Sequence, residues 1–384
     1  MKKIASLAAL AAGVALAASA CSSSASTTTN SSGTKVNWAT VTNLQAAGGM
    51  SALVAAAKAE GHLNVITLPR TWANYGTIMD AFTKEYGIQI TDANPNGSSG
   101  DEITAVTNDK TLSDAPDVLD VGNSHALPNT ALFAPYEVST WSDIPAALKD
   151  PNGTWYGDYG GYITIACNPA AINGAPCPKT FADLLNPAYT ADYKGKVALD
   201  GDPTSANAAF SGVWAAALAE GGSLDNLQPG IDFFKKLKAN GEFTDTASTE
   251  STIEQGSTPI SIDWEFNNSQ YAADLKSKGI NLTVSVPSDG LYSAYYDQAI
   301  NKDAPHPAAA RLWEEFIYSA AVQNDFMGGF ARPVEFDAMQ TAGSLNSTDE
   351  ANLPKVTGTA QFPSAAQQTT AQALVTSDWA SSVG

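Results

Sequence analysis

The sequence predicts an α/β protein folded into two lobes, each with a mainly parallel sheet covered by helices. Segments of helical periodicity alternate along the chain with short apolar segments typical of buried strands. At 384 residues the chain is also longer than the roughly 250 to 300 residues at which a single hydrophobic core stops growing. Its 44% of hydrophobic residues exclude a disordered chain, and 39 acidic against 20 basic side chains exclude a nucleic-acid-binding protein.

The first lobe is predicted to begin near Ser51, where a capping serine, an Ala-rich helix and a terminating glycine follow one another in SALVAAAKAEG. The strand LNVITL comes next, and a helical pattern over residues 74–86 leads to the strand GIQITDA. We expect a further helix over residues 101–110 and a third strand in APDVLDVG. This alternation predicts a helix-covered sheet.

A second series of the same kind starts in KGKVALDGD. Helices are predicted over residues 207–220, 231–239 and 306–321, and strands in TPISIDWEF and NLTVSVPSDG. After Arg332 and Pro333 the periodicity weakens and the elements are harder to place. No short internal repeat is present, so two lobes of similar construction fit better than a solenoid or a propeller.

The first twenty residues are typical of an export signal. Lys2 and Lys3 precede an uncharged, Ala-rich apolar stretch that is too short for a membrane-spanning helix. Small residues directly before Cys21 resemble the lipobox of bacterial lipoproteins, which predicts a signal peptide over residues 1–20 and a lipid on Cys21. The alternative is an ordinary secretory peptide with Cys21 incidental. If Cys21 carries a lipid, residues 21–50 comprise the anchored cysteine and a Ser- and Thr-rich flexible tether. The body of the protein is then expected to be lipid-anchored outside the bacterial cell membrane.

The two remaining cysteines, Cys167 and Cys177, lie ten residues apart, and an exported protein can hold such a pair as a disulfide. A metal site is the weaker alternative, because none of His62, His125 and His306 lies near the pair at ligand spacing. We therefore expect a disulfide and no metal.

Open α/β sheets bind ligands at the carboxyl ends of their strands, so the loops after strands are the candidate site. Trp72 and Tyr75 follow the first strand and can offer aromatic faces to a ligand, a cation above all. Ser98 and Ser99 precede a helix, where hydroxyls and free N–H groups form a hydrogen-bond or anion site. The alternatives are core packing for the aromatic pair and simple helix capping for the serines.

Asp202, Thr204 and Ser205 open a helix of the second lobe in the same way, directly after a strand. Helix capping and ligand binding between the lobes remain equal alternatives for them.

A second constellation in this lobe combines aromatic and acidic side chains. Asp263, Trp264 and Glu265 end a predicted strand and place an indole between two carboxylates, which suits a cationic guest. Tyr295 and Asp297 form a similar set after the next strand. The alternative for the carboxylates is a pair of solvated charges at the rim, and one tyrosine of this region is expected in the core.

Catalytic signatures are missing from the sequence. It contains no GxSxG, HExxH, P-loop or strand-linked GxGxxG motif, and its three histidines are scattered. Asp263 and Glu265 are an unsuitable pair for cleaving a glycoside, since they diverge from one strand end. We therefore expect no enzyme and no cofactor.

Together, several of these segments resemble the extracellular solute-binding proteins of ABC importers, in the branch that holds spermidine/putrescine-binding and ferric-iron-binding proteins. The resemblance covers about residues 51–332. It rests on the lipobox-like Cys21 and on the segments SALVAAAKAEG, LNVITLPRTWANYG, DVLDVGNS, WYGDYGGYITIACN, FADLLNPAYTADYKGKVALDGDPTSANAAF and AINKDAPHPAAARLWEEFI.

The resemblance implies a two-lobed type II periplasmic-binding-protein fold with a hinge, a ligand cleft between the lobes and two chain crossings, near residues 156–162 and 288–296. Lobe 1 would comprise residues 51–158, lobe 2 residues 159–290, and residues 291–384 would return to lobe 1 and form the C-terminal segment. It further implies a monomer that hands its ligand to a membrane permease with an ATPase subunit, with a lipid anchor as its one link to the membrane.

For the ligand, the resemblance favours a polyamine-like organic cation. Trp72, Tyr75, Trp264, Tyr295 and Asp297 look like the aromatic and acidic set of polyamine-binding relatives. Ferric iron is disfavoured, because Asp263 and Trp264 stand where iron-binding relatives carry a tyrosine pair. An aminoalkyl phosphonate or phosphate ester, bound by the helix-start serines and threonine, is the second candidate. A lipid-anchored extracellular hydrolase is the alternative from a different class.

Overall fold

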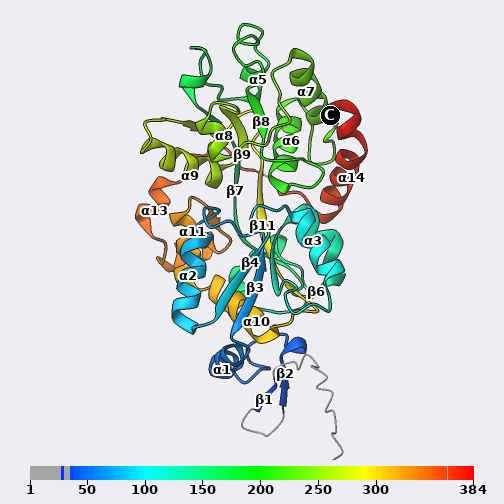
Figure 1. Ribbon diagram of the computed structural model, residues 1–384, viewed down its shortest axis with the longest axis vertical. Helices are drawn as coiled ribbons and strands as arrows, with labels where there is room; N and C mark the ends of the chain where they lie inside the picture. The colour runs from blue at the N-terminus through cyan, green and yellow to red at the C-terminus, as the bar shows by residue number, and fades with distance from the viewer. Residues whose placement is uncertain (1–26, 30–34, 361) are drawn as a thin grey trace, which may run out of the picture.

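The computed structural model describes residues 27–29, 35–360 and 362–384, and Figure 1 shows two lobes stacked along the long axis of the molecule. The predicted export signal and Cys21 lie outside the described residues, so the signal peptide and the lipid stay predictions. In the described part of the chain, no helix is both long enough and apolar enough to cross a membrane.

Lobe 1 is built around the parallel strands β3 (His62–Ile66) and β4 (Gln89–Ala93), with β5 (Val118–Gly122) beside β3. The backbone N–H of Asn64 donates to the Asp117 carboxylate (2.7 Å) and that of Asp117 donates to the Asn64 carbonyl (2.8 Å), which ties β3 to β5. The helices of this lobe are α1 (Met50–Glu60), α2 (Tyr75–Tyr86), α3 (Ser99–Asn108), α4 (Asn123–Ala126), α10 (Pro307–Ile317) and α11 (Ala320–Gly328).

Two long strands, β7 (Tyr156–Cys167) and β11 (Ser293–Asn301), carry the chain between the lobes. The first part of β7 pairs with β11 and the last five residues pair with β9 (Ile260–Trp264) of lobe 2. Both pairings are antiparallel, in the case of β7 and β11 because the chain leaves along one strand and returns along the other, whereas β9 and β8 (Val197–Leu199) are parallel. The expectation of mainly parallel sheets is therefore wrong for this eight-stranded sheet, whose main order is β5-β11-β7-β9-β8.

Glycines in β7 let the crossing strands approach closely. A Cβ on Gly160 would lie 2.4 Å from the carbonyl oxygen of Ala294 in β11, and one on Gly161 would lie 3.0 Å from Glu265. Positions 160 and 161 of the GDYGGY segment therefore have no room for a side chain where β7 passes from one lobe to the other.

Lobe 2 packs its helices around β8, β9 and the end of β7. Trp214 and Tyr292 stack in its core with ring centroids 5.5 Å apart. The predicted disulfide is confirmed: Cys167, the last residue of β7, is bonded to Cys177, with the two Cα atoms 5.7 Å apart. The further elements are β10 (Thr283–Ser285), α5 (Phe181–Leu184), α6 (Asn207–Ala219), α7 (Gln228–Asn240), α8 (Glu250–Glu254) and α9 (Glu265–Lys276).

The C-terminal helix α14 (Ala365–Ser382) contacts both lobes. Its Trp379 packs edge-on against Phe234 of α7, with centroids 5.5 Å apart, while Gln368 Nε2 donates to Asn123 Oδ1 of α4 (3.3 Å). Because α14, β7 and β11 all serve both lobes, the lobe limits at residues 158 and 290 stay predictions. The segment before α14 holds β12 (Arg332–Pro333), α12 (Phe336–Ala342) and α13 (Ser347–Asn352).

The remaining described elements are short. They are the strands β1 (Thr27–Thr29), β2 (Lys35–Asn37) and β6 (Phe133–Ala134), and 3-10 turns at Trp38–Thr40, Leu127–Leu132, Trp141–Asp143, Ala146–Leu148 and Pro169–Ala171.

Candidate ligand-binding site

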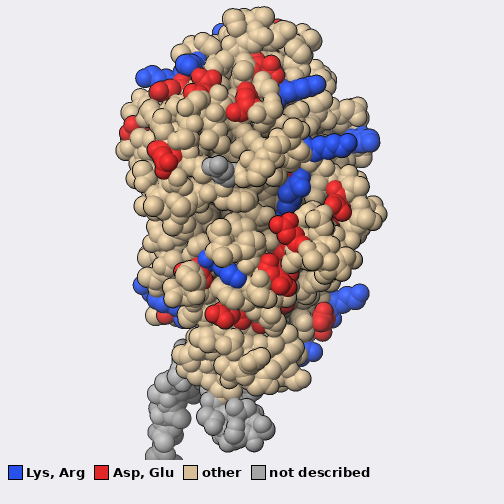
Figure 2. Space-filling model, turned by 180° about the vertical axis from the view of Figure 1, so that it is seen from behind, with Lys and Arg blue, Asp and Glu red and all other residues tan. Residues whose placement is uncertain are grey.

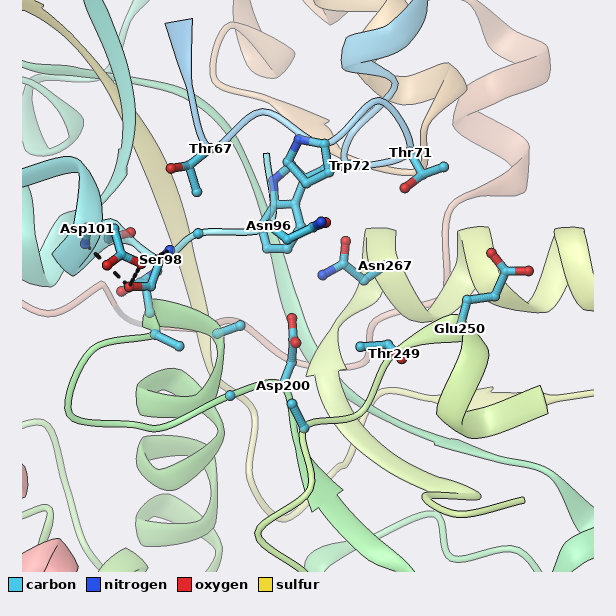
Figure 3. Close-up of a pocket in the computed structure, with 18 of the residues that line it drawn as sticks. Thr67, Thr71, Trp72, Asn96, Ser98, Asp101, Asp200, Thr249, Glu250 and Asn267 are labelled. Carbon is cyan, nitrogen blue, oxygen red and sulfur yellow. Dashed lines mark hydrogen bonds between the residues drawn. The ribbon is translucent and has the colours of Figure 1, made fainter. Parts of the chain in front are cut away.

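A cavity of about 720 Å³ lies between the lobes, at the ends of β3, β4, β5 and β8. Lobe 1 contributes the loops that follow β3 and β4, and lobe 2 contributes the loop after β8 together with α8 and α9. In Figure 3, Asp200 and Asn267 of lobe 2 point toward Trp72 and Asn96 of lobe 1. A ligand site in the loops at the carboxyl ends of the strands was predicted from the sequence, and the cavity lies there. Its volume suits a small organic solute.

Trp72 forms the aromatic wall on the lobe 1 side. Its indole Nε1 donates to the Tyr159 hydroxyl (2.5 Å), and its ring meets Phe266 and Tyr296 edge-on, with centroids 5.3 and 5.5 Å away. The loop that carries Trp72 turns through positive φ at Ala73 (43°) and Asn74 (67°). Non-glycine residues adopt this conformation at an energetic cost, and such costs gather at functional sites.

The two serines of lobe 1 line the cavity but already have protein partners. Ser98 caps α3 reciprocally with Asp101, so the capping alternative is confirmed for this residue. Ser99 Oγ accepts the backbone N–H of Gly122 at the end of β5 (3.0 Å).

In the loop after β8, Asp202 and Ser205 line the cavity and Thr204 does not. The Asp202 carboxylate accepts from the backbone N–H of Thr204 (2.9 Å) and from its hydroxyl (2.8 Å), which fixes the turn. The Thr204 carbonyl accepts from Gln372 of α14 (3.1 Å), so this loop is held from behind by the C-terminal helix.

Six further predicted site residues do not line the cavity. Tyr75 is fully buried and donates to Asp158 (3.0 Å), because the turn at Ala73 and Asn74 directs the start of α2 inward. Asp263 and Trp264 are both 0% exposed, and the Glu265 carboxylate pairs with the Arg332 guanidinium at 2.7 Å. The ring of Tyr295 lies 5.6 Å from that of Phe362, between centroids. The Asp297 carboxylate accepts a hydrogen bond from the Asn123 amide (2.6 Å).

Asp263, Trp264 and Glu265 lie outside the cavity because of the junction between β9 and α9. Strand β9 ends at Trp264 and α9 begins at Glu265, so no loop separates strand from helix. The side chains that were expected at a strand-end loop are therefore enclosed by packed secondary structure.

The cavity instead gathers carboxylates, of which the sequence analysis singled out Asp202 alone as a candidate site residue. Asp101, Glu102, Asp120, Asp200, Asp202, Glu250 and Glu254 all line it. The one basic side chain in the lining is Lys278, whose ammonium already pairs with Glu250 (3.1 Å) and Glu254 (2.7 Å). Asp120 lies inside the strand VLDVG, whereas Asp200 directly follows β8 and begins the loop that also carries Asp202, so its place at a strand end was the available signal.

Burial changes the protonation of the deepest carboxylates. It raises the pKa of Asp120 to about 7, against the lowering effect of the hydrogen bond from Tyr159. Burial likewise raises the pKa of Asp200 to about 7 and that of Glu102 well above its usual range. Oxygen Oε2 of Glu102 is buried without a hydrogen-bond partner. The cavity lining thus holds a buried carboxyl oxygen without a partner and carboxyls that retain protons near neutral pH.

The outer surface differs from the cavity. On the face shown in Figure 2, acidic and basic side chains are scattered among wide uncharged areas. The carboxylates of the cavity are therefore not the continuation of an acidic patch on that face. Among the described residues, no group of three or more His, Cys, Asp or Glu side chains is arranged to hold a metal ion.

Comparison with known proteins places this geometry in context. A family model described as bacterial extracellular solute-binding protein matches residues 115–364. The Fe(3+)-binding periplasmic protein of Serratia marcescens is 28% identical over 165 residues. That match spans 42% of this chain and 44% of the relative, less than half the length of either.

Solved structures match over most of the chain. The periplasmic binding protein AfuA from Actinobacillus pleuropneumoniae, with exogenous fructose-6-phosphate bound, has a TM-score of 0.65 at 18% identity and covers 84% of this chain and 98% of its own. The ferric binding protein from Campylobacter jejuni has a TM-score of 0.61 at 16% identity and covers 84% and 99%. These likenesses confirm the two-lobed type II periplasmic-binding fold.

Proposed function

Because the chain belongs to the family of bacterial extracellular solute-binding proteins, we propose that it captures a small solute between its lobes and delivers it to a membrane permease driven by a separate ATPase. The family is one of binding proteins and not of enzymes, so the extracellular hydrolase is not proposed. The lipid on Cys21, the monomeric state and the attachment to the cell membrane belong to the same proposal and are supported by the sequence.

The proposed ligand is a small organic cation of the polyamine class. The observation that carries this choice is the charge of the cavity lining, which has seven carboxylates and a single ammonium that two of them already neutralise. An ammonium ligand would give the buried carboxyls of Glu102 and Asp120 and the half-buried Asp200 a partner, and the face of Trp72 is suited to its methylene chain or its charge.

An aminoalkyl phosphonate or phosphate ester is the second candidate. It is supported by Asn207, a buried residue of the cavity lining whose Nδ2 donor has no partner. Ferric iron ranks third, because the described part of the chain offers no suitable ligand cluster.

The test is a titration of the purified protein with putrescine, spermidine, fructose 6-phosphate, 2-aminoethylphosphonate and ferric citrate, followed by calorimetry and thermal unfolding. We expect one-to-one binding of an amine and stabilisation of about 2.7 kcal/mol when the ligand is at 100 times its Kd. Binding of a phosphorus compound or ferric citrate alone would contradict the cation assignment and leave the transport role intact. Binding of none of the five would contradict the polyamine proposal itself.

A further inference from the structure

We propose that the ligand is a dication whose two charged groups are held one per lobe, by Asp120 in lobe 1 and Asp200 in lobe 2, and that its capture drives protons from these sites into solution. This inference rests on the proposed function, namely capture of an organic cation. It assigns the two ammonium-binding residues and makes ligand affinity depend on pH.

In lobe 1, Asp120 lines the cavity and a second carboxylate, Asp158 of β7, lies behind it. The amide of Gln298 connects the two, since its Nε2 is 2.9 Å from Asp158 Oδ2 and 3.5 Å from Asp120 Oδ1. The Tyr159 hydroxyl donates to Asp120 (2.7 Å) and the Tyr75 hydroxyl donates to Asp158 (3.0 Å). Both carboxylates are therefore served by neutral donors.

In lobe 2 the arrangement is the same in kind. Asp200 lines the cavity and Asp263 of β9 is fully buried beside it, accepting from the backbone N–H of Trp264 (2.6 Å) and from Asn267 (3.0 Å). Asn267, the amide partner of the inner acid, lines the same cavity as Asp200, and the charge of Asp200 acts on Asp263.

The titratable groups that act on these four carboxylates are acids and tyrosines. For the lobe 1 pair they are Tyr75, Glu102, Tyr159, Tyr296, Asp297, Glu314 and Tyr318, and for the lobe 2 pair they are Tyr271 and Tyr296. Among the interactions described for these pairs, no Lys, Arg or His side chain compensates the charge.

Such pairs retain protons near neutral pH. Burial raises the pKa of Asp120 and of Asp200 to about 7, and burial together with the neighbouring carboxylate raises those of Asp158 and Asp263 well above their usual range. An ammonium group arriving at the outer carboxyl favours its ionised form, so the carboxyl loses its proton to solvent while the ammonium keeps its own. Each site then changes from a neutral acid to an ion pair with the ligand.

A second observation in the same wall points to a polar ligand. Oxygen Oε2 of Glu102 is buried without a hydrogen-bond partner, and Glu102, which is 1% exposed, lines the cavity beside Asp120. A polar group of the ligand is the partner that this oxygen lacks.

The proton release has a definite size. Two outer carboxyls that titrate near pH 7 together hold about one proton at pH 7, close to two protons at pH 6 and almost none at pH 8. Affinity for a dication is therefore expected to be about 100-fold weaker at pH 6 than at pH 8, and affinity for a monocation at one site about tenfold weaker. Aliphatic ammonium groups stay charged over this range, so the ligand does not titrate.

The experiment is calorimetric titration of the protein with putrescine, or with spermidine if it binds more tightly, at pH 6, 7 and 8. Repeating the titration at pH 7 in phosphate and in MOPS, which differ in ionisation enthalpy, gives the number of protons released. We expect about one at pH 7, with Asp200→Asn reducing the release by about half and the pH dependence to about tenfold. Asp120→Asn tests lobe 1 in the same way. If one of these two variants does not fold, as judged by the loss of cooperative unfolding, the other variant serves as the test.

Asp232→Asn, an exposed carboxylate of α7 outside the cavity, is the matched control and is expected to leave proton release unchanged. Amine binding without proton release, or release that Asp200→Asn and Asp120→Asn both leave intact, would overturn this inference while leaving the proposed function standing. No amine binding at any of the three pH values would overturn both.

Discussion

The guanidinium of Arg332 lies 2.7 Å from the carboxylate of Glu265, with the Arg332 side chain 22% exposed and the Glu265 side chain 0% exposed. Glu265 begins α9 of lobe 2, whereas Arg332 belongs to β12, which pairs with β7 at Gly160. Arg332 Nη2 also donates to the Pro354 carbonyl (2.9 Å). This ion pair thus joins lobe 2 to the C-terminal segment near the point where β7 passes between the two lobes.

Removing one partner of this pair is expected to be costly. Arg332→Ala leaves a buried carboxylate without its counter-charge, and we expect the free energy of unfolding to fall by about 3 kcal/mol in urea denaturation. Arg70→Ala is the control, since Arg70 and Asp80 form an ion pair with side chains 59% and 70% exposed, where the expected change is about 0.5 kcal/mol or less. Equal effects of the two substitutions would show that the buried pair has no special role.

The disulfide is expected to stabilise lobe 2. It closes a sequence separation of ten residues, and replacing both Cys167 and Cys177 by serine is expected to lower the free energy of unfolding by about 2.5 kcal/mol. Urea denaturation of the double variant and of the parent protein, with and without reductant, measures this. The prediction fails if reductant destabilises the double variant as much as the parent.

Trp72 is expected to contribute to ligand affinity through its ring. Trp72→Ala removes the aromatic wall, and we expect amine binding to weaken about tenfold, in line with the roughly 1 to 2 kcal/mol of a desolvated cation–aromatic contact. Trp72→Phe keeps a ring but loses the hydrogen bond to Tyr159, so it separates the two contributions. Calorimetry at pH 8 is the measurement, and unchanged affinity in Trp72→Ala would contradict the prediction.

The sequence predicted the place of the site better than its side chains. Strand ends face each other across the cavity as expected, and Trp72 lies there because the loop after β3 begins at a strand end. Asp263 and Trp264 are enclosed because β9 continues directly into α9, a junction without the glycine or loop residues that mark such boundaries. Asp120 escaped notice because it sits inside an apolar strand segment, where an acid is read as part of the strand.

The crossing of the chain near residues 156–162 was predicted through the family resemblance, but the strand direction was not predicted. Alternating helices and strands favour parallel pairing within each lobe, and β3–β4 and β8–β9 follow this rule. The antiparallel pairing of β7 with β11 depends on contacts between segments more than 130 residues apart. Local periodicity carries no information on such contacts.

Stability is expected to fall as pH rises toward 8. Burial raises the pKa of Glu60 and of Glu335 from 4.5 to about 7, so between these values the folded protein binds more protons than the unfolded chain. The contribution of these groups is therefore fully present below about pH 4.5 and is lost as pH rises through about 7. His125, whose pKa burial lowers to about 4, acts in the opposite direction below about pH 6.5.

Urea denaturation of the ligand-free protein at pH 5, 6, 7 and 8 tests this prediction, with Glu335→Gln as the variant that removes one contribution. We expect a smaller decline between pH 5 and 8 in the variant. A free energy of unfolding that increases over this range in the parent protein would show that the buried acids are ionised in the folded state.

The two strands that both lobes share also bear on how the molecule comes apart. Because β7 pairs with β11 over its first part and with β9 of lobe 2 over its last five residues, the eight-stranded sheet cannot be lost from one lobe without unpairing a strand that continues into the other. We therefore expect the protein to unfold as a single cooperative unit despite its two-part outline, in one transition that circular dichroism and tryptophan fluorescence report at the same urea concentration. A solute bound in the cavity is therefore expected to stabilise the far end of each lobe against unfolding as much as it stabilises the cavity itself.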